Sequence, residues 1–133
     1  MKKNVTLSQI LIVFMLTIGF IENSFAQDKN LVVRIAKLQI DSVQLESYKA
    51  ALKEEIEASV RIEQGVLTLY AVSDKNNPTH ITVFEIYANQ EAYKAHVDTP
   101  HFKKYKTTTK DMVKSLELME TVPIALKAKP SKE

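Results

Sequence analysis

The chain has 133 residues, enough for a single domain with a modest hydrophobic core. Its formal net charge is only +2, a balance that argues against binding to nucleic acid or to an anionic membrane surface. Because it contains no cysteine, disulfides are excluded, and packing or oligomerisation must provide the stability.

The first 26 residues have the layout of a secretory signal peptide. Lys2 and Lys3 form a positive start, residues 10–21 are an apolar run, and Ser24-Phe25-Ala26 provides small residues before a cleavage site. The run is shorter than the ~20 residues that a spanning helix needs. An uncleaved anchor is the alternative, because Glu22 follows the run closely. We expect cleavage near Ala26 and a mature protein in the periplasm or the medium, without membrane attachment.

Residues 27–126 are predicted to form one domain, and residues 127–133 a Lys-rich tail. The domain opens with a predicted strand over residues 31–40, which are rich in branched side chains. A helix over residues 42–60 follows, where Asp41 and Gln44 resemble a capping box. Apolar residues recur along this helix at steps of three and four, as in an amphipathic helix: Leu45, Tyr48, Leu52, Ile56 and Val60.

Gly65 ends this helix, and we expect it to adopt a positive φ that other residues avoid. Two strands are predicted next, over residues 66–72 and 80–87. The segment between them, SDKNNPT, consists of turn-forming residues, so the two strands are predicted to form a hairpin.

Two helices and a last strand complete the domain. Asn89 is a predicted cap for a short helix over residues 90–97. Thr99-Pro100 starts a second helix, which continues to Met112, because proline is favoured at the first helical position. The final strand is predicted over residues 116–121.

The predicted order is βαββαβ, an α+β domain of the ferredoxin-like type with helices on one face of the sheet. The strand over residues 80–87 has Val83 and Tyr87 on one face and Phe84 and Ile86 on the other. Since both faces are apolar, a second copy of the sheet is the economical cover, and we predict a homodimer.

Several stretches resemble the antibiotic biosynthesis monooxygenase family: RIEQGVL at 61–67, FEIY at 84–87, EAY at 91–93 and HVDTPHF at 96–102. The resemblance spans about residues 31–124 and implies a dimeric α/β-barrel. Members are monooxygenases of quinols or polyketides without cofactors, haem-degrading enzymes, and isomerases of small phosphorylated carbonyl compounds. The haem-degrading members use a tryptophan and a histidine in the helix after this last stretch. The chain has no tryptophan, and residues 102–106 contain no histidine, so haem degradation is disfavoured.

His96 and His101 admit three interpretations: a metal site, a catalytic role, or ordinary positions around a turn. Helical zinc pairs have histidines at i and i+4, whereas Pro100 separates these two, so we expect no metal and no shared direction. His96 is either a general base, since histidine titrates near neutral pH, or a cap on its helix. The resemblance favours the base, because members place this histidine at the cleft. His101 is expected to be peripheral, as a partly exposed residue or a gate at the pocket mouth.

Other side chains are assigned around His96. Glu85 either orients a histidine in the cleft or pairs with Arg34 or Arg61. Tyr70 is expected to donate a hydrogen bond in the pocket, although tyrosine in a strand is more often a packing residue. Arg61 would anchor an anion or hold the dimer. The remaining predicted substrate contacts are Tyr87 and Phe102, the latter also expected in the core.

The sequence has no Gly-rich phosphate loop, no catalytic triad pattern, no cysteine nucleophile and no flavin or nicotinamide signature. The leading hypothesis is an exported monooxygenase that oxidises a quinol-like or phenolic molecule with O2 as co-substrate and no cofactor. His96 would be its base, with Glu85 and Tyr70 as helpers. The alternatives are a barrel that binds a small ligand or protects the envelope without catalysis, and an isomerase using the same histidine.

Overall fold

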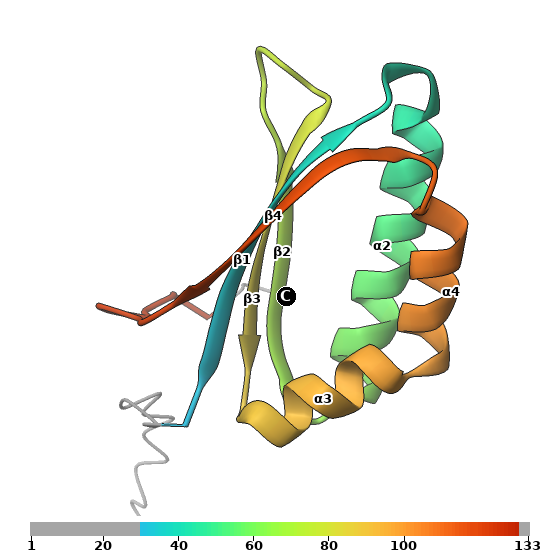
Figure 1. Cartoon of the computed structure of the whole chain (residues 1–133). Helices are drawn as coiled ribbons and strands as arrows, with labels where there is room; N and C mark the ends of the chain where they lie inside the picture. The colour runs from blue at the N-terminus through green and yellow to red at the C-terminus, as the bar shows by residue number, and fades with distance from the viewer. Residues whose placement is uncertain (1–29, 131–133) are drawn as a thin grey trace, which may run out of the picture.

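The domain is an antiparallel four-stranded sheet with helices on one face (Figure 1). The structure is a computed structural model and describes residues 30–130. The strand order is β2-β3-β1-β4. This arrangement confirms the predicted ferredoxin-like α+β fold. The elements are β1 (Val32–Ile40), the 3-10 turn η2 (Ser42–Gln44), α2 (Leu45–Ile62), β2 (Val66–Ser73), β3 (His80–Tyr87), α3 (Gln90–Asp98), α4 (Pro100–Thr109) and β4 (Val113–Thr121).

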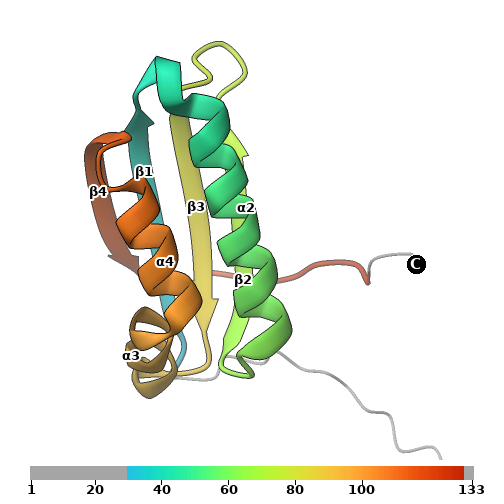
Figure 2. The ribbon, with the colours of Figure 1, turned by 90° about the vertical axis from the view of Figure 1, so that its right-hand side faces the viewer.

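Helices α2 and α4 lie side by side over the sheet, and α3 crosses one end of it (Figures 1 and 2). Tyr48 and Leu52 of α2 are buried against the sheet. The sheet residues in the same apolar cluster are Ala36, Leu38, Ile40, Ile81 and Val83. Removing these side chains from water provides the main driving force for packing the two layers together.

The buried face of α2 differs from the predicted stripe. Tyr48 and Leu52 are buried as expected, but the face continues through Glu55 and Ser59, and Val60 is exposed. The Ser59 hydroxyl donates to Glu55 Oε1 at 2.7 Å, so this pair satisfies part of its own hydrogen bonding inside the domain. The helix therefore turns Val60 outward and brings two polar residues into the interior beside Ile56, which still packs against the core.

Three local predictions at element ends were wrong. Gly65 does not have a positive φ; instead, a Cβ built on it would lie 2.4 Å from the Cβ of Ala92 in α3, so the position requires a residue without a side chain. The Gln44 amide donates to the Asp111 carbonyl at 3.2 Å rather than closing a capping box. The last helix ends at Thr109, because a turn there leads directly into β4.

The caps of the two short helices are as predicted. The Asn89 side chain accepts from the backbone N–H of Ala92 at 2.8 Å at the start of α3. Thr99 caps α4 by accepting from the N–H of Phe102, and Pro100 occupies the first turn. The break between the helices therefore places His96 in the last turn of α3 and His101 in the first turn of α4.

The sheet face opposite the helices is largely apolar and partly exposed. Tyr70 and Val72 of β2 are 65% and 64% exposed on it. After β4 the chain leads to this side of the sheet (Figure 1). There residues 125–128 line a shallow groove together with Tyr70, Phe84 and Ile86. No helix within residues 30–130 is long and apolar enough to cross a membrane. The predicted signal peptide and the last residues of the tail lie outside the described residues.

We propose that a second copy of the chain covers this apolar face, as predicted from the sequence. Light scattering at micromolar concentration should give twice the monomer mass. Val72→Lys places a charge on the face and should shift the mass toward the monomer. Val43→Lys, at a 92% exposed position outside the sheet, is the matched control and should leave the mass unchanged. A folded monomer for the unaltered chain would contradict the proposal.

Candidate active site

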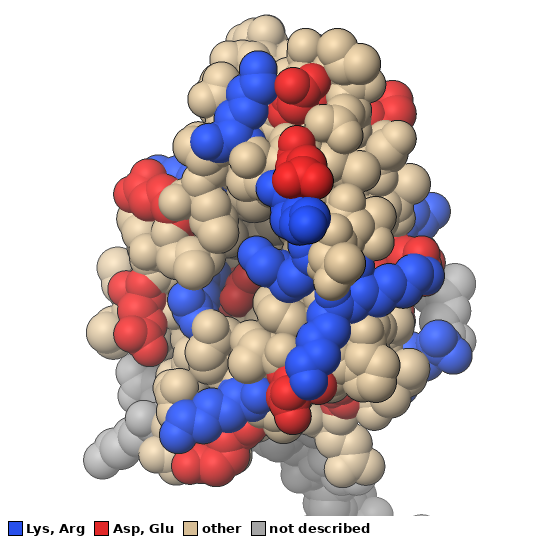
Figure 3. Space-filling view, turned by 45° about the vertical axis from the view of Figure 1, so that its right-hand side comes forward, with Lys and Arg blue, Asp and Glu red and all other residues tan. Residues whose placement is uncertain are grey.

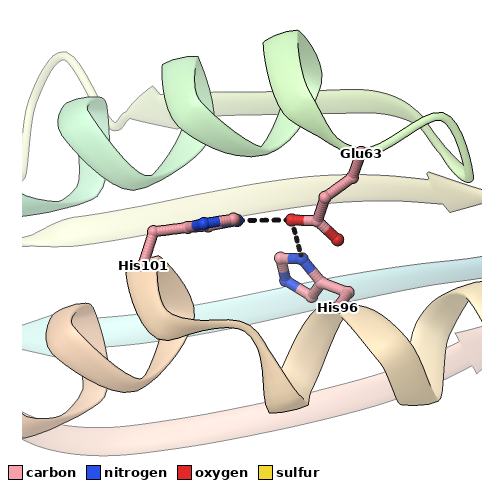
Figure 4. Close-up of side chains that lie close together, drawn as sticks. All are labelled: Glu63, His96 and His101. Carbon is pink, nitrogen blue, oxygen red and sulfur yellow. Dashed lines mark hydrogen bonds and ion pairs between the residues drawn. The ribbon is translucent and has the colours of Figure 1, made fainter.

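One carboxylate joins three helices at the end of the sheet that α3 crosses. Glu63 Oε1 lies 3.1 Å from His96 Nδ1 and 2.5 Å from His101 Nε2 (Figure 4). Glu63 caps the C-terminus of α2, where its backbone N–H donates to the Ser59 carbonyl at 2.9 Å. The two histidines come from α3 and α4. Both imidazoles therefore point at the same oxygen, which corrects the expectation that Pro100 would leave them without a shared direction.

The electrostatics of this cluster favour an ionised Glu63. Partial burial alone would raise the pKa of Glu63, but the hydrogen bonds from His101 and His96 outweigh it and hold the pKa below its usual range. Because a carboxylate only accepts hydrogen bonds, Nδ1 of His96 and Nε2 of His101 carry the hydrogens in this arrangement. Nε2 of a neutral His96 is then free to accept a proton.

The second ring nitrogen of His96, Nε2, lies near the buried carboxyl group of Glu55. His96 is 3% exposed, and its Nε2 is 3.7 Å from Glu55 Oε1, which exceeds a normal hydrogen bond. Burial raises the pKa of the Glu55 carboxyl, and this effect outweighs the opposing influence of the Ser59 hydrogen bond and of His96. The environment thus shifts the pKa values of the two carboxyl groups near His96 in opposite directions. Glu63 is held ionised, and Glu55 is shifted toward the protonated form.

A cavity of about 100 Å³ lies between the sheet and the helices, with His96 and Glu55 on its wall. Rings line much of it: Tyr87 packs 5.2 Å from His96, and Phe102 packs 4.8 Å from His96 between ring centroids. At the edge of the sheet, the cavity reaches Leu116 and Leu118 of β4, which are 43% and 50% exposed. The site is therefore apolar, with a few convergent polar groups, as small-molecule sites usually are.

Glu85 lies on the same cavity wall. The Tyr87 hydroxyl donates to Glu85 Oε2 at 3.1 Å. Burial raises the pKa of Glu85, against the opposing effects of the Tyr87 hydrogen bond and of Arg34. Arg34 is opposite Glu85 in the β1–β3 register. No ion pair within 4.0 Å joins them, although both line the cavity.

The structure brings His96, Glu85, Tyr87 and Phe102 to one cavity but separates Tyr70 from them. A β-bulge at Leu67 shifts the β2–β3 register, so Tyr70 pairs with Phe84 rather than with Val83. A shift of one residue turns a side chain to the opposite face of a sheet. Tyr70 consequently lies on the face away from the helices and does not line the cavity of the His96 in its own chain.

Arg61 and His101 also lie outside this cavity. Arg61 is exposed in the last turn of α2 and lines a groove beside Val60 and Tyr70. His101 is partly buried and lines a smaller cleft with Glu54 and Lys104, so it approaches Glu63 from outside the cavity. Of the two expected positions for His101, it has that of a partly exposed residue rather than that of a gate at the mouth of the cavity.

Glu63, His96 and His101 also have a spacing that can hold a metal ion. Each offers one ligand atom, and these atoms lie within 4.8 Å of one another. The hydrogen bonds that join them account for the same arrangement without an ion, so the prediction of no metal stays a prediction. The argument from Pro100, however, does not support it.

Glu63, Glu55 and Ser59 were missed as site residues in the sequence. Glu55 and Ser59 continue the spacing of Tyr48 and Leu52 by steps of three and four, so polar residues on an otherwise apolar helix face were the available signal. Glu63 had no such signal, because it follows the last residue of α2 and meets residues 33 and 38 positions further along the chain.

Comparisons with known proteins identify the family to which this fold belongs. The family model described as antibiotic biosynthesis monooxygenase matches residues 31–108. A solved structure of a candidate antibiotic biosynthesis monooxygenase from Bacteroides thetaiotaomicron is 54% identical, with a TM-score of 0.75, over 76% of this chain and 98% of that chain. The chain belongs to the antibiotic biosynthesis monooxygenase family.

Two further solved structures show how far this family likeness extends. A candidate monooxygenase from Lactobacillus acidophilus is 35% identical, with a TM-score of 0.69. The match covers 70% of this chain and 44% of that longer chain. A candidate family member from Nitrosomonas europaea, 21% identical over 71% of this chain and 99% of that one with a TM-score of 0.67, shares the fold. No match was found among curated proteins.

The lowered pKa of Glu63 predicts a pH dependence of stability. A carboxyl group whose pKa is lower in the folded state stabilises the fold above its unfolded pKa, about 4.3, and this stabilisation is lost as the pH falls through the folded pKa. Glu63→Gln should lower the free energy of unfolding at pH 7 by roughly 1–2 kcal/mol. Its melting temperature should then fall less steeply than that of the wild type below about pH 4.3.

Glu57→Gln is the matched control, because this exposed glutamate of α2 pairs only loosely with Lys53 at 3.7 Å. Its melting curves should follow those of the wild type at every pH. Parallel pH profiles for Glu63→Gln and the wild type would mean that the histidines do not stabilise an ionised Glu63.

Proposed function

We propose that this protein is a cofactor-independent monooxygenase that oxidises a quinol-like or phenolic small molecule with O2. The observation that carries the proposal is the environment of His96, a buried imidazole on a cavity wall with Nδ1 hydrogen-bonded to a carboxylate. That carboxylate fixes the ring orientation and the tautomer, which leaves Nε2 as a base. Membership of the monooxygenase family supports an oxygenase over other uses of the base.

The base begins the reaction by taking the phenolic proton at Nε2. The resulting anion is electron-rich enough to reduce O2 by one electron, which gives a substrate radical and superoxide. These recombine at a ring carbon that carries hydrogen, forming a C–O bond and, after protonation, a hydroperoxide. Loss of water leaves one oxygen atom on the ring as a carbonyl group, and the other departs in the water. The substrate supplies all the electrons.

The cavity supports these steps in two ways. The aromatic side chains around His96 make that part of the wall apolar, which would limit the access of water to the radical pair. The raised pKa values of Glu55 and Glu85 favour neutral carboxyl groups, which would repel a substrate anion less than carboxylates would. In this proposal Glu63 is a positioning residue for His96, and Glu85 and Tyr87 contact the substrate.

Oxygen uptake by the purified protein with simple hydroquinones tests the proposal. His96→Ala should reduce turnover by roughly 10²-fold or more, as expected for loss of a general base. His101→Ala should reduce it much less, because His101 contacts Glu63 but does not line the cavity. Circular dichroism should show that both variants are folded.

Equal losses in the two variants would contradict the assignment, as would activity that is restored by an added metal or abolished by a chelator. Proton exchange into a carbonyl substrate without oxygen uptake would instead identify an isomerase. Ligand binding with neither reaction would identify a binding barrel.

We also propose that the protein is exported, on the basis of the sequence of its first 26 residues. The mature protein should start near Gln27, and N-terminal sequencing of protein from the periplasm or medium checks this. Intact Met1 on cytoplasmic protein would contradict it.

Basic and acidic side chains are interspersed over the face in Figure 3, in keeping with a small-molecule partner rather than nucleic acid.

A further inference from the structure

Arg34 is a guanidinium on the cavity wall with an unused hydrogen-bond donor. It lies in β1 at the centre of the sheet and lines the same cavity as His96. Its Cζ atom lies 4.3 Å from the centre of the Tyr93 ring, so the charged group lies over an aromatic face. Within residues 30–130, Arg34 Nε is the only buried side-chain nitrogen or oxygen without a hydrogen-bond partner.

The neighbouring carboxyl groups do not account for Arg34. Glu85 and Glu120 flank it in the register of β3 and β4. Neither forms an ion pair with it within 4.0 Å, and Glu120 is exposed to solvent. Glu85 instead accepts from Tyr87, and its burial favours the neutral form. A buried N–H without a partner is rare in native proteins, and an acceptor brought by a ligand would satisfy it.

The other lining residues and the volume of the cavity indicate the charge and the size of the ligand. Lys106 of α4 also lines the cavity, which adds a second cation to the wall. The volume of about 100 Å³ is below the roughly 150 Å³ of an apolar cavity that takes up benzene. A cavity of this size that opens toward Leu116 and Leu118 favours a ligand with a single aromatic ring over one with a fused polycyclic skeleton.

We propose that the cavity selects a single-ring phenol that carries a carboxylate group, which Arg34 binds through paired N–H donors. Arginine matches a carboxylate in this way because its donors form a rigid planar fork. Arg34, which would bind the carboxylate, and His96, which would take the phenolic proton, are linked by two tyrosine rings. Arg34 lies over the Tyr93 ring, and the Tyr87 ring packs against both Tyr93 and His96. The inference rests on the proposed function for the reaction at the phenol, but not for binding of the carboxylate.

The test is calorimetric binding under nitrogen, so that no turnover occurs. The ligands are 2,5-dihydroxybenzoate, its methyl ester and hydroquinone. The acid should bind the wild-type protein at least about tenfold more tightly than the ester, because the ester cannot form the charged pair. Arg34→Met should remove this preference while leaving the Kd of the ester within about twofold.

Two further variants complete the experiment. Arg34→Lys keeps the charge without the fork and should keep only part of the preference, which also covers the case in which Arg34→Met does not fold. Lys110→Met removes one positive charge at an exposed position after α4 and should leave the preference intact. Acid and ester with equal Kd, or a preference that survives in Arg34→Met, would overturn the inference.

The outcome is separable from that of the proposed function. Tight, Arg34-dependent binding of the acid without oxygen uptake in air would reject the oxygenase and keep the carboxylate site. Oxygen uptake with hydroquinone, together with no discrimination between acid and ester, would keep the oxygenase and reject the site.

Discussion

The shared hydrogen bond at Glu63 Oε1 is the constraint on which the rest of the site depends. A partly buried carboxylate needs donors, and here the two imidazoles of α3 and α4 supply them. Glu63 itself is fixed by the end of α2, so one oxygen ties the ends of three helices. Thr99 reinforces the break between α3 and α4, because its hydroxyl donates to the His96 carbonyl at 2.7 Å. The direction of the His96 ring is therefore a property of the helix arrangement rather than of α3 alone.

The interior behind this contact combines polar groups with aromatic rings. The hydroxyls of Tyr48 and Tyr105 hydrogen-bond at 2.7 Å, and Ser59 donates to Glu55. Satisfied pairs of this kind avoid the penalty of burying lone polar atoms, so the helices can pack closely over a sheet that still presents carboxyl groups. The result is a small cavity in which burial, rather than opposite charge, determines the protonation of Glu55 and Glu85.

Local patterns were sufficient to predict the elements and their order. Asn89 and Thr99 were recognisable as caps, because capping depends on a residue and its next few neighbours. The face on which Tyr70 lies was not predictable in the same way, since a single bulge at Leu67 reverses it and the sequence of β2 carries no mark of the bulge. His96 was found as a candidate, but its partner Glu63 was not. Their contact depends on the angle between helices that are distant in sequence.

Gly65 shows a different kind of dependence. Its carbonyl accepts from the N–H of Ala88 at 2.9 Å, which anchors the turn after α2 beside the start of α3. A methyl group at Gly65 would collide with Ala92 and push α3 outward, carrying His96 away from the carboxylate two residues before the glycine. The chemistry of the imidazole is therefore sensitive to volume at a residue that has no functional group. In this domain the alignment of a proton acceptor is decided by how closely a bare backbone can approach a helix.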